Sequence, residues 1–298
     1  MIILPCPKRP DLDCIAGAVA YAEYLTKAKG QTARVWICGT PDAEAEFYLH
    51  KYPHLVFAND EDVASAKAFI LVDFSVKDIL PPNVSAHKVI QVIDHRNFTT
   101  PHDDFPNADV HIDMVGAAAT QITEYFMHDK VELSPESAAM LHGAIVTHTL
   151  CLRSATTTER DIAAVEWLKQ YVPDGAELVR GQLKKRANEI ISQMPSILDT
   201  EMKLETSCLG RYGFTLLELK DAADFWAKHY KMIKDWAKSK NFPVIVDIID
   251  PIRNESIIYV SKDDYCALLA DRLSAQAKEN VFLLDPAWFR KQIIPLLK

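Results

Sequence analysis

Short apolar runs alternate with amphipathic stretches along the first half of the chain. Nearly continuous apolar runs are typical of strands that are covered on both faces, and they occur at residues 2–6, 33–38, 68–75, 88–96 and 108–113. Helical periodicity or helix-start signals occur at residues 15–29, 41–51, 115–127, 134–149 and 162–171. This alternation predicts an α/β fold whose N-terminal domain contains a doubly wound, mainly parallel sheet.

The pattern changes after a long, charge-rich stretch at residues 173–193, which Met194-Pro195 interrupts. We expect this stretch to be a helix that connects two domains. Beyond it, strands are predicted at residues 202–206, 213–218, 244–249, 255–260 and 281–285, with helices at 222–239 and 264–279. The predicted domains are residues 1–190 and a smaller α/β domain at residues 197–298.

Polar side chains follow three of the predicted strands. Asp11 and Asp13 lie in the turn after the first strand, Asp73 ends the third, and Asp94-His95-Arg96 ends the fourth. Each has a structural explanation when it is taken alone: Asp13 could cap a helix, and Asp94-His95-Arg96 could form a local ion pair. Ligands bind beyond the carboxyl ends of the strands in open parallel sheets. The convergence of these groups therefore predicts a metal and phosphate site.

Two further groups of polar residues are ambiguous. His148 follows an apolar helix, and its residue type alone favours a structural helix-end histidine over a metal ligand. Arg290 and Lys291 stand beside apolar residues near the C-terminus, where their sequence context alone favours a solvated pair of cations.

Composition excludes some classes of function. A net charge of -8 over 298 residues argues against a general nucleic-acid or membrane binder, although local cations can still hold a small anion. The six scattered cysteines form no CxxC pair, which favours free and mostly buried thiols in a reducing cytosol over disulfides or zinc ligands. No signal peptide or membrane span is recognisable, so a cytoplasmic location is expected.

Several short motifs resemble those of the DHH phosphoesterases in order and spacing. They are Pro10-Asp-Leu-Asp13, Val72-Asp73, Ile93-Asp-His-Arg96, Val115-Gly-Ala-Ala-Ala-Thr120, and Thr147-His-Thr-Leu150 with Ser154-Ala-Thr-Thr-Thr158. The tail Arg290-Lys-Gln-Ile-Ile-Pro295 resembles the substrate-binding motif in the C-terminal domain of family II (manganese-dependent) inorganic pyrophosphatases. Prune-type and yeast-type exopolyphosphatases share this two-domain build. The resemblance covers nearly the whole chain.

The resemblance implies one or two divalent cations, Mn²⁺ or Mg²⁺, at the edge of the N-terminal domain. Asp73 would bridge two ions and would act in catalysis with His95 and Arg96. The full set of implied metal ligands is Asp11, Asp13, Asp73, His95 and His148. The substrate-binding residues would be Arg96, Lys203, Arg290 and Lys291, with the C-terminal domain clamping the phosphates.

Four positions depart from the pyrophosphatase pattern. Pro7 stands where pyrophosphatases have a histidine, and it offers no side-chain ligand, so the ion site of Asp11 should fill weakly. His148 replaces an aspartate, which removes one negative charge and favours a softer cation or a weaker site. Arg96 replaces a second histidine, a variant more like the prune type. Phe289 replaces the first cation of the tail motif.

The leading interpretation is a divalent-metal-dependent hydrolase of phosphoanhydrides that acts on short-chain inorganic polyphosphate or pyrophosphate. A phosphodiesterase for small nucleotides is an alternative, although aromatic residues that could stack on a base are not evident near the tail. A degenerate, non-catalytic member that binds an anion or a partner is another, and Pro7 and His148 support it. The oligomeric state stays open, with a homodimer as one option.

Overall fold

The computed structural model describes residues 1–96 and 101–298, which form two compact units. The first unit comprises Met1–Gln182 and the second Leu183–Lys298. The division falls inside helix α8 (Gly175–Ser192), somewhat before the expected domain end at residue 190. The long helix that we expected as a connector is therefore shared between the units. Each unit is described by itself below.

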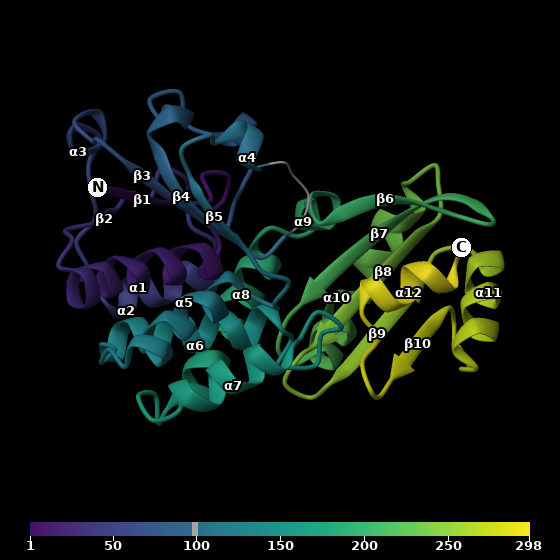
Figure 1. Ribbon diagram of the computed structural model, residues 1–298. Helices are drawn as coiled ribbons and strands as arrows, with labels where there is room; N and C mark the ends of the chain where they lie inside the picture. Colours follow the sequence, from purple (N-terminus) through teal and green to yellow (C-terminus); the bar gives the residue numbers. More distant parts are fainter. Residues whose placement is uncertain (97–100) are drawn as a thin grey trace. The chain divides into compact units, whose positions relative to one another are not determined.

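The sheet of the first unit confirms the predicted fold class. Its five strands are all parallel and have the order β2-β1-β3-β4-β5 (Figure 1). Their bounds are Ile2–Pro5 for β1, Arg34–Val35 for β2, Phe69–Val72 for β3, Val89–Asp94 for β4 and Asp109–Ile112 for β5. Each predicted strand is present, but β2 is much shorter than its apolar run.

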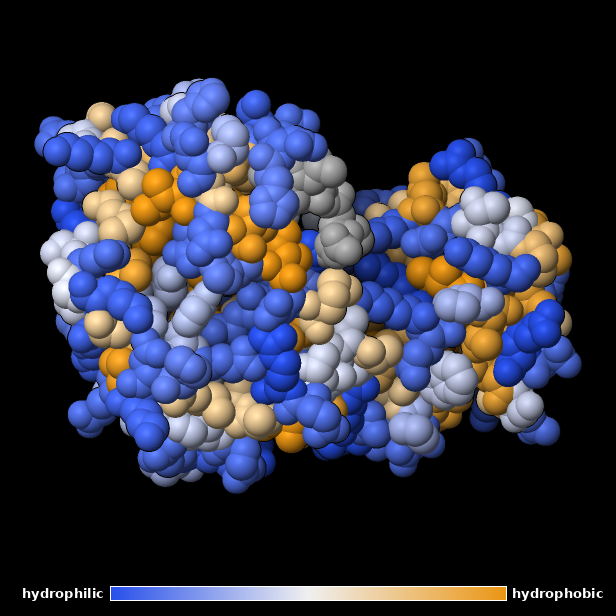
Figure 2. Space-filling view, viewed as in Figure 1, coloured by the Kyte–Doolittle hydropathy of each residue, from blue (hydrophilic) through white to orange (hydrophobic). Residues whose placement is uncertain are grey.

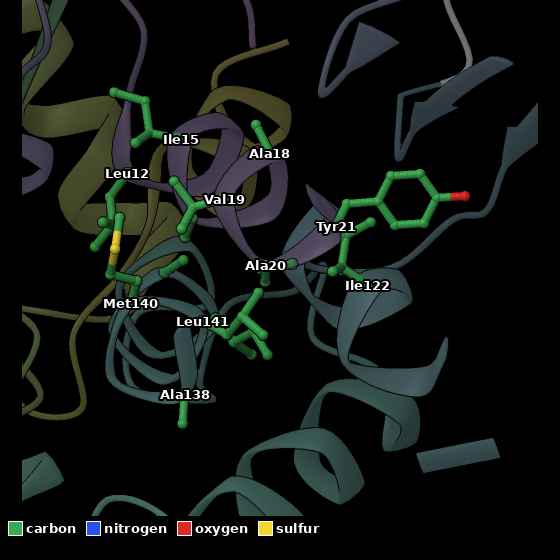
Figure 3. Packing of buried hydrophobic residues seen from close by; sticks show 14 of the residues in the cluster. Leu12, Ile15, Ala18, Val19, Ala20, Tyr21, Ile122, Ala138, Met140 and Leu141 are labelled. Atoms are coloured by element: carbon green, nitrogen blue, oxygen red, sulfur yellow. The ribbon is translucent and has the colours of Figure 1, made fainter. Parts of the chain in front are cut away.

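Helices cover both faces of this sheet. One face is packed by α1 (Leu12–Lys29), α5 (Ala118–Asp129) and α6 (Pro135–His148), with α2 (Ala43–Lys51) and α7 (Glu159–Leu168) beside them. Figure 3 shows Leu12 of α1 beside Met140 of α6, and Tyr21 beside Ile122 of α5. A second apolar cluster fills the other face, where α3 (Asp60–Ala64), α4 (Pro101–Asp104) and two short 3₁₀ turns lie.

Helix α1 begins earlier than its hydrophobic pattern predicts. The expected start was Ile15, whereas the helix starts at Leu12 with Asp11 as its N-cap. The Asp11 carboxylate accepts a hydrogen bond from the backbone N–H of Cys14 at 3.1 Å, as a capping side chain does. Asp13 is therefore not the cap, and it lies inside the first helical turn.

The second unit has a mixed sheet with the order β10-β9-β8-β7-β6. Only β7 and β8 pair in parallel, and the other neighbours are antiparallel, including the predicted hairpin of β6 and β7. The strands are β6 (Met202–Ser207), β7 (Gly210–Glu218), β8 (Val244–Asp250), β9 (Glu255–Val260) and β10 (Val281–Leu284). The sheet is again covered on both faces, which gives two apolar clusters.

The helices of the second unit differ in part from the expectation. One face packs against α10 (Ala222–Lys238) and the short α9 (Ser196–Thr200), and the other against α11 (Asp263–Leu273) and α12 (Arg290–Leu296). Helix α11 ends at Leu273 instead of residue 279, because Ser274 adopts the left-handed conformation with a φ of 50°. Helix α12 places Arg290 and Lys291 in its first turn.

The burial of the six cysteines differs from the expectation. All six cysteines are free, as predicted, but only Cys14 and Cys266 are buried, while Cys38 and Cys208 are exposed. The expectation that most thiols are buried was wrong, because apolar neighbours in sequence do not ensure burial. On the face seen in Figure 2, hydrophobic patches are interrupted by hydrophilic residues. Among the residues that the structure describes, no helix is long and apolar enough to cross a membrane.

Candidate metal centre

Three neighbouring parallel strands bring their carboxyl ends to one edge of the first sheet. Strand β3 lies between β1 and β4, so the turn after β1, Asp73 after β3 and His95 after β4 lie close together. Asp73 adopts a φ of 61°, in the left-handed region that aspartate tolerates better than most residues. The sheet topology thus produces the convergence that the strand ends predict.

Asp13 is completely buried and is held by backbone N–H groups. Its Oδ2 accepts a hydrogen bond from the N–H of Ala118 at 2.7 Å, and its Oδ1 accepts one from Ala119 at 2.8 Å. Both donors belong to the first turn of α5, whose N-terminus favours a negative charge. Asp13 therefore joins α1 to α5 and at the same time presents a fixed carboxylate to its other neighbours.

His95 is oriented by the backbone. Its Nδ1 lies 2.9 Å from the carbonyl oxygen of Val115, which can only accept, so Nδ1 carries a proton in this contact. The other ring nitrogen, Nε2, then points toward two carboxylates, at 3.3 Å from Asp73 Oδ1 and 3.8 Å from Asp13 Oδ2. A backbone acceptor on one ring nitrogen is the usual device that orients a metal-binding histidine.

His148 reaches the same place from the end of α6. Its Nδ1 lies 3.7 Å from Asp13 Oδ2, and its Nε2 lies 3.7 Å from Asp11 Oδ2. Ligand atoms of Asp13, His95 and His148 all lie within 4.8 Å of one another. The position of His148 among these acidic groups favours the role of ligand over that of a helix-end histidine.

The carboxylates of the site favour a positive charge beside them. Burial would lower the pKa of His95, but its hydrogen bond to Asp73 and the charge of Asp13 raise that pKa to about 9. Burial and the nearby carboxylates raise the pKa of Asp73 to about 7. Burial also acts to lower the pKa of His148, yet the charges of Asp13 and Asp11 raise it. At the two histidines the acidic groups stabilise the cationic imidazolium, and at Asp73 they favour the protonated, uncharged acid. A divalent ion would supply positive charge to all three groups.

Arg96 contacts this cluster directly. Its Nη2 donates to the backbone oxygen of Asp73 and, at 2.9 Å, to Asp73 Oδ1, while its Nε lies 3.3 Å from Asp94 Oδ1. Asp94 in turn accepts the hydroxyl of Ser75 and the backbone N–H of His95. Asp94 thus stabilises the turn and orients Arg96, whose side chain is 40% exposed and can still reach an anion.

A second group of ligand atoms includes a residue that sequence reasoning had set aside. Atoms of Asp11, Cys14 and Asp73 all lie within 4.8 Å of one another. Burial first, and the nearby carboxylates second, raise the pKa of the Cys14 thiol well above its usual range. The scattered spacing of the cysteines predicts no metal-binding thiol among them. The signal that could have identified Cys14 is its position directly after the Asp11-Leu12-Asp13 motif, three residues beyond Asp11.

The chemistry of the donors fits a divalent cation. Carboxylate oxygens and imidazole nitrogens suit Mn²⁺, and carboxylates suit Mg²⁺. The predicted ligands are Asp11, Asp13, Asp73, His95 and His148, and the fold brings all five to one edge of the sheet. Their individual roles stay predictions.

The second unit contains a cluster of cations. Lys203 on β6 lies near Arg290 and Lys291 of α12, and repulsion from Arg290 is the main cause that lowers the pKa of Lys203. A bound anion would relieve this repulsion. Phe289, which stands where the tail motif of pyrophosphatases has its first cation, is 8% exposed and packs in the interior of the unit. The cluster of Lys203, Arg290 and Lys291 is thus a candidate phosphate site, and its role stays a prediction.

Comparisons with known proteins agree with the fold. Residues 1–145 match the family model described as DHH family, N-terminal domain. The chain is 26% identical over 304 residues to a probable manganese-dependent inorganic pyrophosphatase of Bacillus licheniformis, and the match covers 97% of this chain and 95% of that protein. It is also 26% identical over 321 residues to the manganese-dependent inorganic pyrophosphatase of Methanocaldococcus jannaschii. This match covers 98% of this chain and 96% of that protein.

Two solved structures share the fold over nearly the whole chain. A putative family II inorganic pyrophosphatase of Methanococcus jannaschii has a TM-score of 0.63 and 24% identity, and the match covers 100% of this chain and 98% of that one. An exopolyphosphatase-related protein of Bacteroides fragilis has a TM-score of 0.51 and 12% identity, and the match covers 99% of this chain and 89% of that one.

Proposed function

We propose that this protein, whose residues 1–145 are a DHH family domain, is a divalent-metal-dependent hydrolase of phosphoanhydrides. The observation that carries the proposal is the group of Asp13, His95 and His148, whose ligand atoms lie within 4.8 Å of one another beside Asp73. Full-length similarity to proteins named manganese-dependent inorganic pyrophosphatases supports the same reaction class.

The cofactor in this proposal is Mn²⁺ or Mg²⁺, with one or two ions per chain. When bound, such ions neutralise the phosphate charge and make water a better nucleophile. The protein holds the ligands ready: backbone N–H groups fix Asp13, and the Val115 carbonyl fixes the ring of His95. Asp73 Oδ1 lies 3.3 Å from His95 Nε2, and a carboxylate oxygen of Asp73 lies within 4.8 Å of a ligand atom of Asp11. This position suits a carboxylate that bridges two ions.

The proposed substrates are pyrophosphate and short-chain inorganic polyphosphate. Arg96 would bind phosphate next to the metal ligands, and the cluster of Lys203, Arg290 and Lys291 would bind phosphate in the second unit. Mutual repulsion among these three cations supports this role, because a polyanion would stabilise them together. In this proposal residues 197–298 remain the substrate-clamping domain.

Several broader expectations belong to the same proposal. The net charge of -8 argues against general nucleic-acid binding, and a local cluster of cations can still hold a small anionic substrate. A cytoplasmic location belongs to the same proposal and is compatible with the six free cysteines. A homodimer is compatible with the proposal.

The non-catalytic alternative rests on one specific observation. Pro7 removes a side-chain ligand from the group around Asp11, and a site with too few ligands could bind an ion or anion without turnover. The presence of His148 within the metal cluster does not support that alternative, since the imidazole occupies a ligand position beside Asp13.

The decisive experiment is a phosphate-release screen of dialysed protein with Mn²⁺, Mg²⁺ or Co²⁺. Pyrophosphate, tripolyphosphate, longer polyphosphate and small nucleotides serve as substrates. We expect release from one or more of the inorganic phosphoanhydrides, and its loss in His95→Gln but not in His111→Gln. His111 is a suitable control because it lies on β5 and pairs with Asp109 at 2.7 Å. Release from nucleotides alone would favour the phosphodiesterase, and metal binding without any release would favour the non-catalytic protein.

A further inference from the structure

A thiol lies where the second ion of the proposed function would bind. Asp11, Cys14 and Asp73 each offer a ligand atom, and these atoms all lie within 4.8 Å of one another. Cys14 and Asp73 are buried, whereas Asp11 is partly exposed and leaves a route for an ion from solvent. Since Pro7 has no side-chain donor, this site would have only carboxylate ligands without Cys14.

The first turn of α1 fixes the thiol beside the carboxylate of Asp11. Asp11 Oδ1 accepts the N–H of Cys14 at 3.1 Å, and the thiol of Cys14 donates to the Asp11 carbonyl oxygen at 3.2 Å. Cys14 is the third residue of an 18-residue helix. The N-terminus of a helix stabilises the negative charge of a thiolate, whereas burial and the nearby carboxylates raise the pKa of Cys14. The thiolate therefore requires the bound cation, whose charge offsets that of the carboxylates.

Asp73 completes the group from the neighbouring strand end. Its ion pairs with His95, at 3.3 Å, and with Arg96, at 2.9 Å, both use Oδ1. Neither uses Oδ2. The Oδ2 of Asp73, which takes part in neither ion pair, is available to an ion bound by Asp11 and Cys14.

We propose that Cys14 supplies the ligand that Pro7 cannot: its thiolate binds the second divalent cation together with Asp11 and Asp73. This inference rests on the proposed function. Metal–sulfur bonds of about 2.3 Å and metal–oxygen bonds of about 2.1 Å keep two ligand atoms of one ion at most about 4.4 Å apart. The ligand atoms of this group all lie within 4.8 Å of one another, so small side-chain movements would bring them into this range. On binding, the S–H bond breaks, the proton leaves to solvent, and the sulfur lone pair binds the cation with no change of oxidation state.

This assignment changes the metal preference of the protein. A thiolate is a soft ligand that favours Co²⁺, Zn²⁺ or Cd²⁺ over Mg²⁺, whereas the first group, built on Asp13, His95 and His148, has no sulfur. The two ion sites of one chain should therefore differ in kind, with a thiophilic ion in the second.

The test is a Co²⁺ titration of the full-length protein, freed of metal by chelation and dialysis and kept reduced. A thiolate bound to Co²⁺ gives a charge-transfer absorption in the near ultraviolet, which carboxylate and imidazole ligands do not give. We expect the unaltered protein to bind two Co²⁺ ions, with this absorption growing in for one of them. Cys14→Ser should remove the absorption and weaken Cd²⁺ binding at that site by about 100-fold, while Mg²⁺ binding changes much less.

Two features of the design keep the result decisive. Serine keeps a hydroxyl donor for the Asp11 carbonyl, so Cys14→Ser should fold, and cadmium NMR of the unaltered protein reports a sulfur ligand if that variant fails. Cys6→Ser is the matched control, because Cys6 is a half-buried thiol near the same carboxylates. Burial raises the pKa of Cys6, and the charges of Asp73 and Asp11 raise it further. This control should keep the absorption.

The outcomes separate this inference from the proposed function. Binding of two Co²⁺ ions without a thiolate absorption, or an absorption that survives Cys14→Ser or disappears in Cys6→Ser, would overturn the role of Cys14 and leave the proposed function standing. Binding of a single ion without the absorption would also overturn it. A protein that binds no divalent cation would overturn both.

Discussion

Asp13 in the first unit and Asp247 in the second are both completely buried, yet their surroundings are opposite. Two backbone N–H groups donate to Asp13, and two imidazoles lie within 3.8 Å of its Oδ2. Asp247, in the middle of β8, has no hydrogen-bond partner on either oxygen in the described part of the chain. Burial raises the pKa of Asp247 well above its usual range, and Glu218 adds to this.

The difference shows how a fold can use a buried acid. At the end of a sheet, helix N-termini and strand ends supply hydrogen-bond donors and cationic side chains to a buried carboxylate, which is thereby held in place and can bind a metal. In the middle of a strand the neighbouring backbone groups are engaged in the sheet, so an acid there is neutral when buried. Burial alone therefore does not mark a site; the partners of the acid do. The predictions below test this contrast, starting with the largest effect.

Asp73→Asn should abolish metal binding and hydrolysis together. The variant removes the charge that the two ion groups share, and we expect activity to fall by about 1,000-fold or more. Asparagine is chosen because it tolerates the φ of 61° at this position, so the fold should remain intact. Metal analysis, phosphate release and circular dichroism check this. Asp109→Asn, which changes an exposed acid on β5, two strands away from β3, is the control, and retained activity in Asp73→Asn would refute the site assignment.

Asp13→Ala should destabilise the first unit even without metal. The backbone N–H groups of Ala118 and Ala119 would lose their acceptor in the interior, at a cost of about 1–3 kcal/mol for each donor that finds no other partner. A thermal melt in the presence of chelator measures this effect apart from metal loss. If Asp13→Ala melted at the same temperature as the unaltered protein, the carboxylate would act as a ligand only.

Lys203→Met should weaken substrate binding by about tenfold, seen as a higher KM with little change in kcat, because it removes one charge-assisted contact to phosphate. The effect should shrink at higher ionic strength, since an exposed charge is screened. Steady-state kinetics at two salt concentrations measure it. Lys298→Met, at the exposed end of the chain, is a control, and an equal effect there would show that only net charge matters.

His148→Asp separates a ligand from a helix-end histidine. As a ligand, the new carboxylate would raise affinity for Mn²⁺ or Mg²⁺ by about tenfold, and hydrolysis would persist or increase. As a structural group, the aspartate would meet the negative end of α6 and lower the melting temperature, with little change in metal affinity. Metal titration at a pH well above the imidazole pKa, beside thermal melts, decides between the two.

Asp247→Val should stabilise the second unit, the reverse of the effect at Asp13. Replacing a buried acid without partners by an apolar side chain recovers part of a desolvation cost of about 1–3 kcal/mol. The pKa of Asp247 is higher in the folded than in the unfolded protein, so its destabilising effect is small near pH 4 and grows as the pH rises toward the folded pKa. The gain from Asp247→Val should therefore be larger at pH 7 than at pH 4, and a gain independent of pH would show that folding does not shift the pKa of Asp247.

The class of fold and the residues that could bind metal are predictable from the sequence alone. Apolar runs marked the five strands of the first sheet, and Ser134 before Pro135 marked the start of α6, because strand burial and helix capping depend on a few neighbouring residues. The strand ends also indicated Asp73 and His95, since parallel strands carry their carboxyl ends to one edge. Element boundaries were less certain, as the early start of α1 at Leu12 shows.

How these residues act together depends on contacts that form only when the chain folds. The tertiary structure placed His148 within 3.7 Å of both Asp11 and Asp13, joined Asp13 to the start of α5, and brought the thiol of Cys14 to the carboxylates of Asp11 and Asp73. It also left Asp247 without a partner among the described residues. Distances between residues far apart in sequence depend on how helices and strands pack, and no local pattern of side chains contains that information.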